Sequence, residues 1–307
     1  MKAIVTGGAG FIGSHLVEEL ILNGAEVHVL DNMITGHKEY VHPNAIIHTE
    51  DICSEVAGQI IVKEKPDVVF HLAAQADVSR SILEPQYDAD VNINGTINIL
   101  RACHESAVSK LIFSSTSGVY GNLQRDLISE HDQTGPISYY GLSKLTAESY
   151  IRLFNQLYGL PYTILRYGNV YGPRQTAKGE GGVVAVFLEK LKKGMPLSIH
   201  GDGEQTRDFI YVKDIVHANI ASVNRGNQET IQVSTAQKTS VNQLLDMLTQ
   251  IHGSKVNTVH SAARTGDIKH SCLDNRKARQ LLNWYPKTDI FQGLNETYSF
   301  TSKKEFQ

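Results

Sequence analysis

Short, largely apolar runs alternate with amphipathic stretches through the first half of the chain. Six runs have the length of buried strands: Ala3–Val5, Val27–Leu30, Ala45–Ile47, Val68–Leu72, Leu111–Phe113 and Tyr162–Leu165. Four stretches between them have the apolar spacing of helices: Phe11–Asn23, Glu55–Lys63, Val91–His104 and Tyr139–Tyr158. Because short strands that alternate with helices form βαβ units with right-handed crossovers, the pattern predicts an α/β fold, in which helices cover both faces of a doubly wound parallel sheet.

The pattern loosens after about residue 166. Two glycine-rich stretches interrupt it, at Tyr167–Gly182 and Gly201–Gly203. Helical spacing then returns in three places: Val183–Lys193, Lys213–Val223 and Val241–His252. No low-complexity linker separates the two parts. We therefore predict a first domain over residues 1–166 and a smaller α/β domain over residues 167–307, with segments of the second interleaved with the first.

The composition is that of a folded protein without a polyanionic partner. The chain has 307 residues, of which 41% are hydrophobic, and its 29 Lys and Arg against 32 Asp and Glu give a net charge of -3. This length can bury a sizeable core. Since neutralising a phosphate backbone takes clustered basic side chains, the slightly acidic chain argues against sequence-independent binding of nucleic acid.

Neither a membrane segment nor a metal site is expected. No stretch reaches the roughly 18 apolar residues that span a bilayer, and nothing near Met1 resembles a signal peptide. The three cysteines, Cys53, Cys103 and Cys272, are too far apart for a zinc pattern or a disulfide framework. The 13 histidines show no paired ligand spacing. We expect a cytoplasmic protein that binds no metal and does not contact a membrane.

Three glycines, Gly7, Gly10 and Gly13, follow the first predicted strand and open the first predicted helix. Glycines at this spacing allow a tight turn, a close approach of the backbone to a pyrophosphate and tight packing of helix on sheet. Asp31 follows the second strand, where a carboxylate binds a ribose diol and repels a 2′-phosphate. The pattern predicts a Rossmann-type sheet that binds NAD rather than NADP; a turn without a ligand is the alternative.

Tyr140 and Lys144 are four residues apart and lie on one face of a predicted helix. A free tyrosine has a pKa of about 10, and an adjacent ammonium together with a positive nicotinamide favours its phenolate, which can act as a general base toward a sugar hydroxyl. A pair at this spacing also occurs by chance. The hydroxyl-rich stretch Phe113–Gly121 ends a predicted strand, where ligands bind in open α/β sheets, and this context favours the catalytic interpretation.

These motifs resemble those of the extended short-chain dehydrogenase/reductases and, within them, the nucleotide-sugar epimerases, most closely the UDP-glucose 4-epimerases. The similarity covers nearly the whole chain. Its motifs are, in order, Thr6–Gly13, Asp31–Asn32, Asp51–Ile52, Phe70–Ala74, Asn92 with Gly95–Thr96, Phe113–Gly121, Tyr140–Lys144, Leu165–Gln175, Gly201–Phe209 and Arg264–Asp267. Motifs in this order are specific to the family and less specific to one substrate.

The resemblance implies roles for individual residues. In the family, Tyr140 is the catalytic base, Lys144 holds the nicotinamide ribose, and Thr116 hydrogen-bonds the reacting hydroxyl. The residues implied for NAD binding are Gly7, Gly10, Phe11, Ile12 and Gly13 at the pyrophosphate, Asp31 and Asn32 at the adenosine ribose, Asp51 and Ile52 at the adenine, Leu72, Ala73 and Ala74 at the strand end, and Asn92, Tyr140 and Lys144. Those implied for the UDP moiety are Asn169, Arg207, Arg264 and Asp267. The alternatives are a surface ion pair for Arg207 with Asp208 and a capping role for Asp267.

The implied activity is NAD-dependent epimerisation of a UDP-hexose at C4 through a transient 4-keto sugar. The absence of a carboxylate directly after Thr116 argues against a dehydratase or decarboxylase, and Asn169 argues against a UDP-glucuronate epimerase. Ser271 falls where the family places a gatekeeper beside sugar C2, and its small size favours UDP-GlcNAc and UDP-GalNAc as substrates besides UDP-glucose and UDP-galactose. A reductase and a non-catalytic NAD-sensing regulator are the alternatives from other classes.

The resemblance also implies a homodimer. In the family, two helices of each subunit form a four-helix contact, and here they correspond to Val91–His104 and Tyr139–Tyr158. Three apolar positions of the second helix, Ile151, Phe154 and Tyr158, fit such a contact and fit packing on the sheet equally well.

Overall fold

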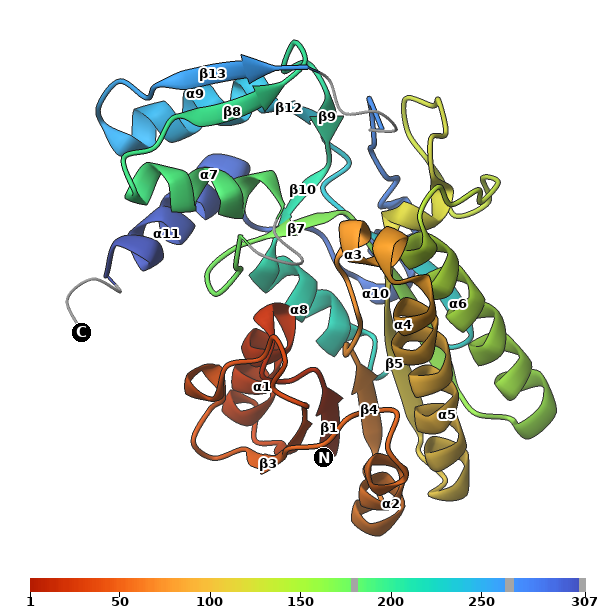
Figure 1. The fold of residues 1–307 in the computed structure, drawn as a ribbon. Helices are drawn as coiled ribbons and strands as arrows, with labels where there is room; N and C mark the ends of the chain where they lie inside the picture. The colour runs from red at the N-terminus through yellow and green to blue at the C-terminus, as the bar shows by residue number, and fades with distance from the viewer. Residues whose placement is uncertain (178–181, 263–267, 304–307) are drawn as a thin grey trace.

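The computed structural model describes residues 1–177, 182–262 and 268–303. Its centre is a seven-stranded sheet in the order β11-β6-β5-β4-β1-β2-β3. The strands are β1 (Lys2–Thr6), β2 (Glu26–Leu30), β3 (Ile46–His48), β4 (Val68–His71), β5 (Lys110–Thr116), β6 (Tyr162–Tyr167) and β11 (Glu229–Val233). Every neighbouring pair is parallel. The sheet, with helices on both faces (Figure 1), confirms the predicted Rossmann-type α/β fold.

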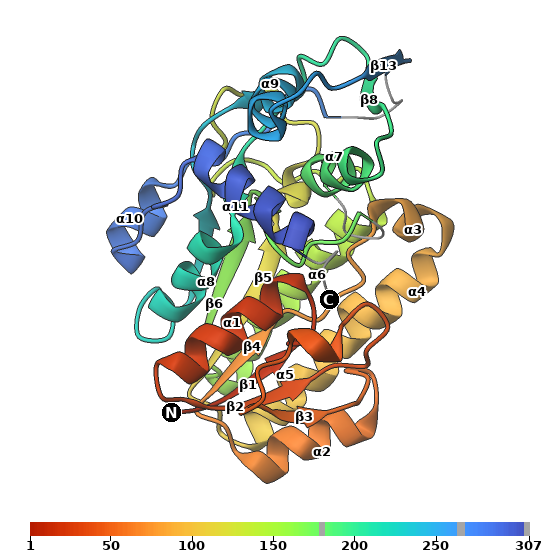
Figure 2. The ribbon, with the colours of Figure 1, turned by 90° about the vertical axis from the view of Figure 1, so that its left-hand side faces the viewer.

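Alternate residues of the strands pack against helices on opposite faces of the sheet. The helices are α1 (Phe11–Leu22) and α8 (Val212–Ala221) on one face, and α2 (Glu55–Glu64), α5 (Gly95–Glu105) and α6 (Tyr139–Tyr158) on the other. In β1, Ala3 and Val5 belong to the core under α1 and α8, whereas Ile4 belongs to the opposite core. Helices α1 and α8 lie side by side (Figure 2). Because both faces are buried, the central strands β1 and β4 have nearly continuous apolar sequences.

The strand order reverses between β1 and β4. The chain runs outward from β1 through β2 to β3, then returns to β4 and continues through β5 and β6 in the other direction. In open sheets of this type, the carboxyl ends of the two strands at the reversal flank a crevice in which ligands bind. The topology alone therefore places a ligand site at the ends of β1 and β4.

A smaller unit lies beyond the carboxyl ends of the strands, at the top of Figure 1. Its elements are β7 (Asn169–Tyr171), α7 (Val183–Lys192), β8 (Leu197–His200), β9 (Thr206–Arg207), β10 (Phe209–Tyr211), β12 (Thr239–Ser240), α9 (Val241–His252), β13 (Thr258–Ser261) and α11 (Ile290–Lys303). The strands pair as β7 with β10, β8 with β13 and β9 with β12. The unit has its own apolar core, which includes Phe187, Leu244 and Leu294.

Short elements complete the described fold. They are α3 (Val78–Leu83), α4 (Pro85–Ala89), a π-helical turn (Asp90–Asn94), α10 (Arg276–Leu282) and two 3₁₀ turns (Lys38–Tyr40 and Ser117–Tyr120). The helices predicted over Tyr139–Tyr158 and Val241–His252 are confirmed at both ends. The helix predicted over Val91–His104 differs, because the π-helical turn precedes α5. The domain boundary at residue 166 stays a prediction. Three elements after that residue, α8, α10 and β11, pack on or join the large sheet.

Candidate active site

Two positions at the turn between β1 and α1, Gly7 and Gly13, have room for glycine only. Gly7 has a left-handed φ of +70°, and a Cβ on it would lie 2.7 Å from the backbone N of Ala73. A Cβ on Gly13 would lie 2.0 Å from the carbonyl oxygen of Gly7. Gly10, which precedes α1, offers no side-chain cap to the helix. The chain therefore presents a bare helix N-terminus, with its partial positive charge, at this turn, and such an end suits a phosphate.

Asp31 lies beside this turn, directly after β2. It is 7% exposed and accepts hydrogen bonds from the backbone N of Ala9 at 3.0 Å and of Met33 at 2.9 Å. Burial raises the pKa of the Asp31 carboxyl above its ordinary value, and these two N–H donors act against the rise. A carboxylate has acceptor sites beyond these two, so Asp31 can also bind a diol. The neighbouring Asn32 donates to Oδ2 of Asp51 at 2.8 Å.

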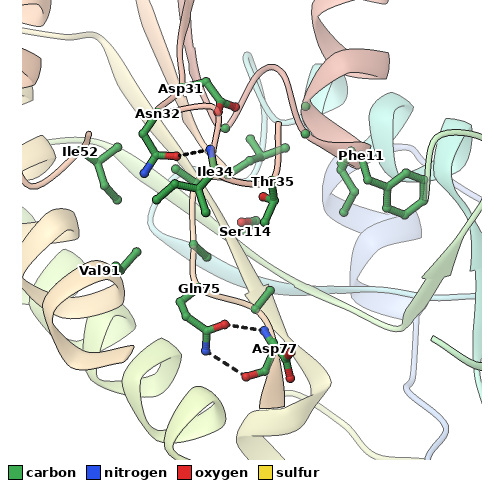
Figure 3. Close-up of a pocket in the computed structure, with 18 of the residues that line it drawn as sticks. Phe11, Asp31, Asn32, Ile34, Thr35, Ile52, Gln75, Asp77, Val91 and Ser114 are labelled. Carbon is green, nitrogen blue, oxygen red and sulfur yellow. Dashed lines mark hydrogen bonds between the residues drawn. The ribbon is translucent and has the colours of Figure 1, made fainter. Parts of the chain in front are cut away.

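A single pocket joins the glycine turn to the ends of the central strands (Figure 3). The sequence-predicted residues that line it are Gly7, Gly10, Phe11, Ile12, Gly13, Asp31, Asn32, Ile52, Leu72, Ala73, Ala74, Tyr140 and Lys144. Ser114 and Ser115, from the predicted hydroxyl-rich stretch, also line it, and the residues that the sequence did not predict are Leu30, Ile34, Thr35, Glu50, Gln75, Ala76, Asp77, Arg80, Tyr87, Val91 and Tyr167. The fold thus brings the glycine turn, Asp31 and the Tyr–Lys pair to one cavity.

Tyr140 and Lys144 reach the pocket from the first two turns of α6. Ser138 caps this helix, because its side chain accepts a hydrogen bond from the backbone N of Gly141 at 3.1 Å. Lys144 is only 3% exposed, and its Nζ lies 4.5 Å from the centre of the Phe113 ring on β5. Water screens a cation in such surroundings weakly, so Lys144 acts strongly on charges that form near it in the pocket.

Three hydroxyl side chains end β5. Ser114 and Ser115 line the pocket, whereas Thr116 is not among its lining residues. Thr116 Oγ1 accepts a hydrogen bond from the backbone N of Gly118 at 3.0 Å and caps the following 3₁₀ turn. A hydroxyl that accepts one hydrogen bond can still donate its own proton, so Thr116 remains able to bond a substrate hydroxyl. That contact stays a prediction.

Asn92 supports the pocket wall and does not line the pocket. It is 2% exposed, and its side-chain amide pairs with the backbone of Gln75: Oδ1 accepts from N, and Nδ2 donates to O, both at 2.9 Å. Nδ2 also lies 3.0 Å from the Oγ of Ser143 on α6. The π-helical turn carries Asn92, and such turns are frequent at functional sites. Gln75 in turn holds Asp77 (Figure 3), so one amide fixes this wall to the helix of Tyr140.

His71 is buried completely at the end of β4. Its ring nitrogens lie 2.7 Å from Oγ1 of Thr6 and 3.0 Å from Oγ1 of Thr96. Burial, with a smaller contribution from the charge of Lys144, lowers the pKa of His71 to about 3. The ring is therefore neutral, and its burial and hydrogen bonds to two threonines favour a packing role over a role as a base.

Three of the residues predicted to bind the UDP-sugar, Asn169, Arg207 and Ser271, lie on the smaller unit. The backbone N of Asn169 in β7 donates to the carbonyl of Asp208 at 2.7 Å, and that of Ser271 donates to the carbonyl of Thr206 at 3.2 Å. Arg207 is the residue between Thr206 and Asp208, whose carbonyls accept these two bonds. The segments that carry Asn169, Arg207 and Ser271 are therefore neighbours in space. None of the three is among the residues that line the described pocket. Arg264 and Asp267 fall outside the described residues.

Residues 1–177, 182–262 and 268–303 contain no group of three or more His, Cys, Asp and Glu side chains placed to hold a metal ion. No helix among them is long and apolar enough to cross a membrane.

The sequence and the fold both match known proteins. Residues 3–234 match the profile of the NAD dependent epimerase/dehydratase family. A UDP-glucose 4-epimerase from Mycolicibacterium smegmatis is 36% identical over 99% of either chain. A structure of the Thermotoga maritima UDP-glucose 4-epimerase with UDP-glucose is 43% identical, covers 99% of this chain and 100% of its own, and has a TM-score of 0.97. The Thermus thermophilus UDP-glucose 4-epimerase with NAD is 36% identical, covers 98% and 99%, and has a TM-score of 0.93.

The substrates of related structures vary. Solved relatives at 36% and 30% identity are described as epimerases of UDP-N-acetylglucosamine and of UDP-glucuronic acid, and the second holds NAD. The similarity therefore identifies the family and the cofactor, but it does not identify which UDP-sugar is the substrate. The glycine turn and Asp31 fit a dinucleotide without a 2′-phosphate. The chain belongs to the NAD-dependent epimerase/dehydratase family, and NAD is its cofactor.

Proposed function

We propose that this enzyme is a 4-epimerase of UDP-hexoses, which interconverts UDP-glucose and UDP-galactose and also accepts UDP-GlcNAc and UDP-GalNAc. One observation carries the proposal: Tyr140 and Lys144 line the same pocket as the glycine turn. A general base beside a bound nicotinamide can act on a secondary alcohol, and a sugar hydroxyl is such a group.

Each group at the sugar has a separate role. NAD, when bound, would accept a hydride from the sugar and donate it back in its reduced form. Tyr140 takes the proton of the sugar 4-hydroxyl and returns it after the ring has turned over. Bringing a phenol from a pKa of about 10 to about 7 takes about 4 kcal/mol, which the weakly screened Lys144 ammonium helps to supply. Asn169, Arg207, Arg264, Asp267 and Ser271 are the residues proposed to hold the UDP-sugar.

The carboxylates of the pocket argue against a dehydratase or decarboxylase. Such reactions need a second acid or base near the hydroxyl residues, and Ser117 and Gly118 follow Thr116. Among the described lining residues, the carboxylates are Asp31, Glu50 and Asp77. Asp31 is the residue proposed to bind the adenosine ribose. Asp77 caps α3 by accepting from the backbone N of Ser79 at 2.8 Å and of Arg80 at 3.1 Å.

One observation favours a uronate substrate, because Arg80 lines the pocket and could attract a carboxylate. However, its guanidinium pairs with Glu84 at 3.1 Å and lies 4.0 Å from the centre of the Tyr87 ring. We therefore place UDP-glucuronate second. The test is product chromatography of the purified enzyme with UDP-glucose, UDP-galactose, their N-acetyl forms and UDP-glucuronate. Interconversion of the four neutral sugars supports the proposal; turnover of UDP-glucuronate alone, or net formation of reduced cofactor, overturns it.

Replacing Ser271 by tyrosine should separate the two classes of neutral substrate. We expect kcat/KM for UDP-GlcNAc to fall by about tenfold or more, because a larger side chain beside sugar C2 excludes the acetamido group, while UDP-glucose turnover is retained. Ser271→Ala keeps the position small and should turn over both substrates. Equal activity of Ser271→Tyr on both sugars would contradict the gatekeeper role.

We also propose that the enzyme is a homodimer through α5 and α6. Ile151 is buried in the core on the sheet and Phe154 packs against that core, so these two expected contacts do not face a partner. Tyr158, the third expected contact, is 51% exposed. The outer face of α6 also exposes an apolar row, whose members are Tyr139 (48% exposed), Leu142 (48%), Tyr150 (38%), Leu153 (48%) and Leu157 (62%). A row of this kind, at helical spacing, suits burial against a second copy.

A charge in this row should separate the subunits. Leu153→Glu places a carboxylate in the proposed contact, so we expect it to elute from size exclusion as a monomer while the wild type elutes as a dimer. Leu281→Glu is the matched control, because Leu281 is also exposed (39%) but lies on α10. A dimer that persists in Leu153→Glu, or a monomeric wild type, would contradict the proposed interface.

A further inference from the structure

A buried ion pair lies beneath the catalytic helix. Glu148 on α6 is 0% exposed, and Arg166 on β6 is 4% exposed. They make two parallel contacts: Nε of Arg166 donates to Oε1 at 2.8 Å, and Nη2 donates to Oε2 at 2.6 Å. This two-point geometry fixes the direction of both side chains as well as their separation.

The carboxylate of Glu148 makes two further hydrogen bonds. Ser115 Oγ on β5 donates to Oε1 at 2.6 Å, and Nη2 of Arg152, one turn along α6, donates to Oε2 at 2.7 Å. Four bonds use the capacity of a carboxylate. Burial acts to raise the pKa of Glu148, but the hydrogen bonds and charge of Arg166 hold it below its ordinary value. The group is therefore a fully bonded anion at neutral pH.

Arg166 extends the network across the sheet. Its Nη1 donates to the hydroxyl of Tyr120 at 2.7 Å, and that hydroxyl also accepts from Nε2 of Gln232 at 2.5 Å. Tyr120 lies in the 3₁₀ turn that follows Thr116, and Gln232 lies in β11. The polar network thus ties α6 to three adjacent strands, β5, β6 and β11, near their carboxyl ends.

Its place on α6 relates it to the reaction. Glu148 lies one helical turn beyond Lys144 and two turns beyond Tyr140, so the three share a helix face. Ser115, its partner on β5, lines the pocket and precedes Thr116. Apolar packing of α6, through Ala147 and Ile151, tolerates small shifts of the helix, whereas hydrogen bonds of fixed length do not.

We propose that Glu148 and Arg166 are positioning residues, which hold α6 at the height and rotation that set Tyr140 and Lys144 against the hydroxyls at the end of β5. The inference rests on the proposed role of Tyr140. Stability alone does not account for the pair, because desolvation offsets much of its attraction, and apolar residues of similar volume often replace a buried ion pair without loss of stability.

The test removes both charges together, in Glu148→Leu/Arg166→Met. We expect this double variant to fold, to retain bound NAD and to keep its KM for UDP-galactose within about threefold of the wild-type value. Its kcat should fall by about tenfold or more, since small misplacements of reacting groups have effects of this size. Arg152→Met is the matched control: it removes the outer partner of Glu148, leaves Arg166 and Ser115 in place, and should have wild-type kcat.

A second readout separates positioning from a general loss of structure. With α6 displaced, Tyr140 and Lys144 move together, and the phenolate of Tyr140 loses hydrogen bonding from the hydroxyls at the end of β5. The phenolate absorbance of Tyr140 is obtained by subtracting the ultraviolet spectrum of the same protein carrying Tyr140→Phe. This absorbance should therefore appear at higher pH in the double variant than in the wild-type enzyme. A folded double variant with unchanged kcat and unchanged phenol titration would overturn the inference, as would a kcat loss that matches the loss of folded protein. A wild-type enzyme that interconverts no UDP-hexose would instead overturn the proposed function.

Discussion

Tyr140→Phe will lower the rate of UDP-galactose conversion by about two to four orders of magnitude, the range in which a positioned general base contributes. The ring of phenylalanine fills the same space, so we expect the fold and the content of bound NAD to be unchanged. Only the oxygen that takes the proton of the sugar 4-hydroxyl is lost. The measurement is steady-state kcat by product chromatography, with bound NAD released by denaturation and quantified in the same preparation.

The neighbouring tyrosine provides the control. Tyr139 lies one residue earlier in α6 and is 48% exposed, so its hydroxyl can be removed without touching the pocket. We expect Tyr139→Phe to have wild-type kcat. If Tyr140→Phe retained more than about a tenth of the activity, the proton would be taken by another group, and the assignment of Tyr140 as base would be wrong.

Gly13→Ala will abolish NAD binding. The added Cβ would lie 2.0 Å from the carbonyl oxygen of Gly7 and 2.8 Å from Cα of Gly8. Both are backbone atoms, so the turn itself must move, and the N-terminus of α1 moves away from the phosphate position with it. We expect overpacking of this kind to lower the free energy of unfolding by about 1–3 kcal/mol. Purified Gly13→Ala should contain no NAD and show no epimerase activity.

Gly135→Ala is the matched control for this change. A Cβ on Gly135 meets no atom within 4 Å. The variant should therefore carry NAD at the wild-type level and keep its activity. A Gly13→Ala protein that copurifies with a full complement of NAD would show that the glycine turn does not bind the pyrophosphate.

Local motifs predicted several of the residues that line the pocket. Gly7, Gly10 and Gly13 lie within one turn, and Tyr140 and Lys144 lie on one helix, so their spacing in the chain already determines their geometry. Asp31 is recognisable because it ends a strand. Each of these residues lines the pocket in the structure.

Residues that depend on tertiary contacts were harder to predict. Asn92 appeared as a cofactor residue from its motif, but the π-helical turn directs its amide to the backbone of Gln75. Glu148 and Ser115 are 33 residues apart, and no local pattern indicates that their side chains meet. Strand β11 was missed because only two of its five residues, Ile231 and Val233, are apolar, although its last three residues are buried. In each case the deciding partner lies on another element of the fold.

The most direct test of the proposed reaction follows the hydrogen at C4 of the sugar. The enzyme would be incubated with UDP-galactose deuterated at C4, in ordinary water and without added cofactor, and the UDP-glucose formed would be analysed by mass spectrometry. If the same hydrogen leaves and returns within the pocket while Tyr140 exchanges only the hydroxyl proton, the product keeps its deuterium at C4. Loss of the deuterium to solvent, or accumulation of reduced cofactor in step with sugar consumed, would contradict the account.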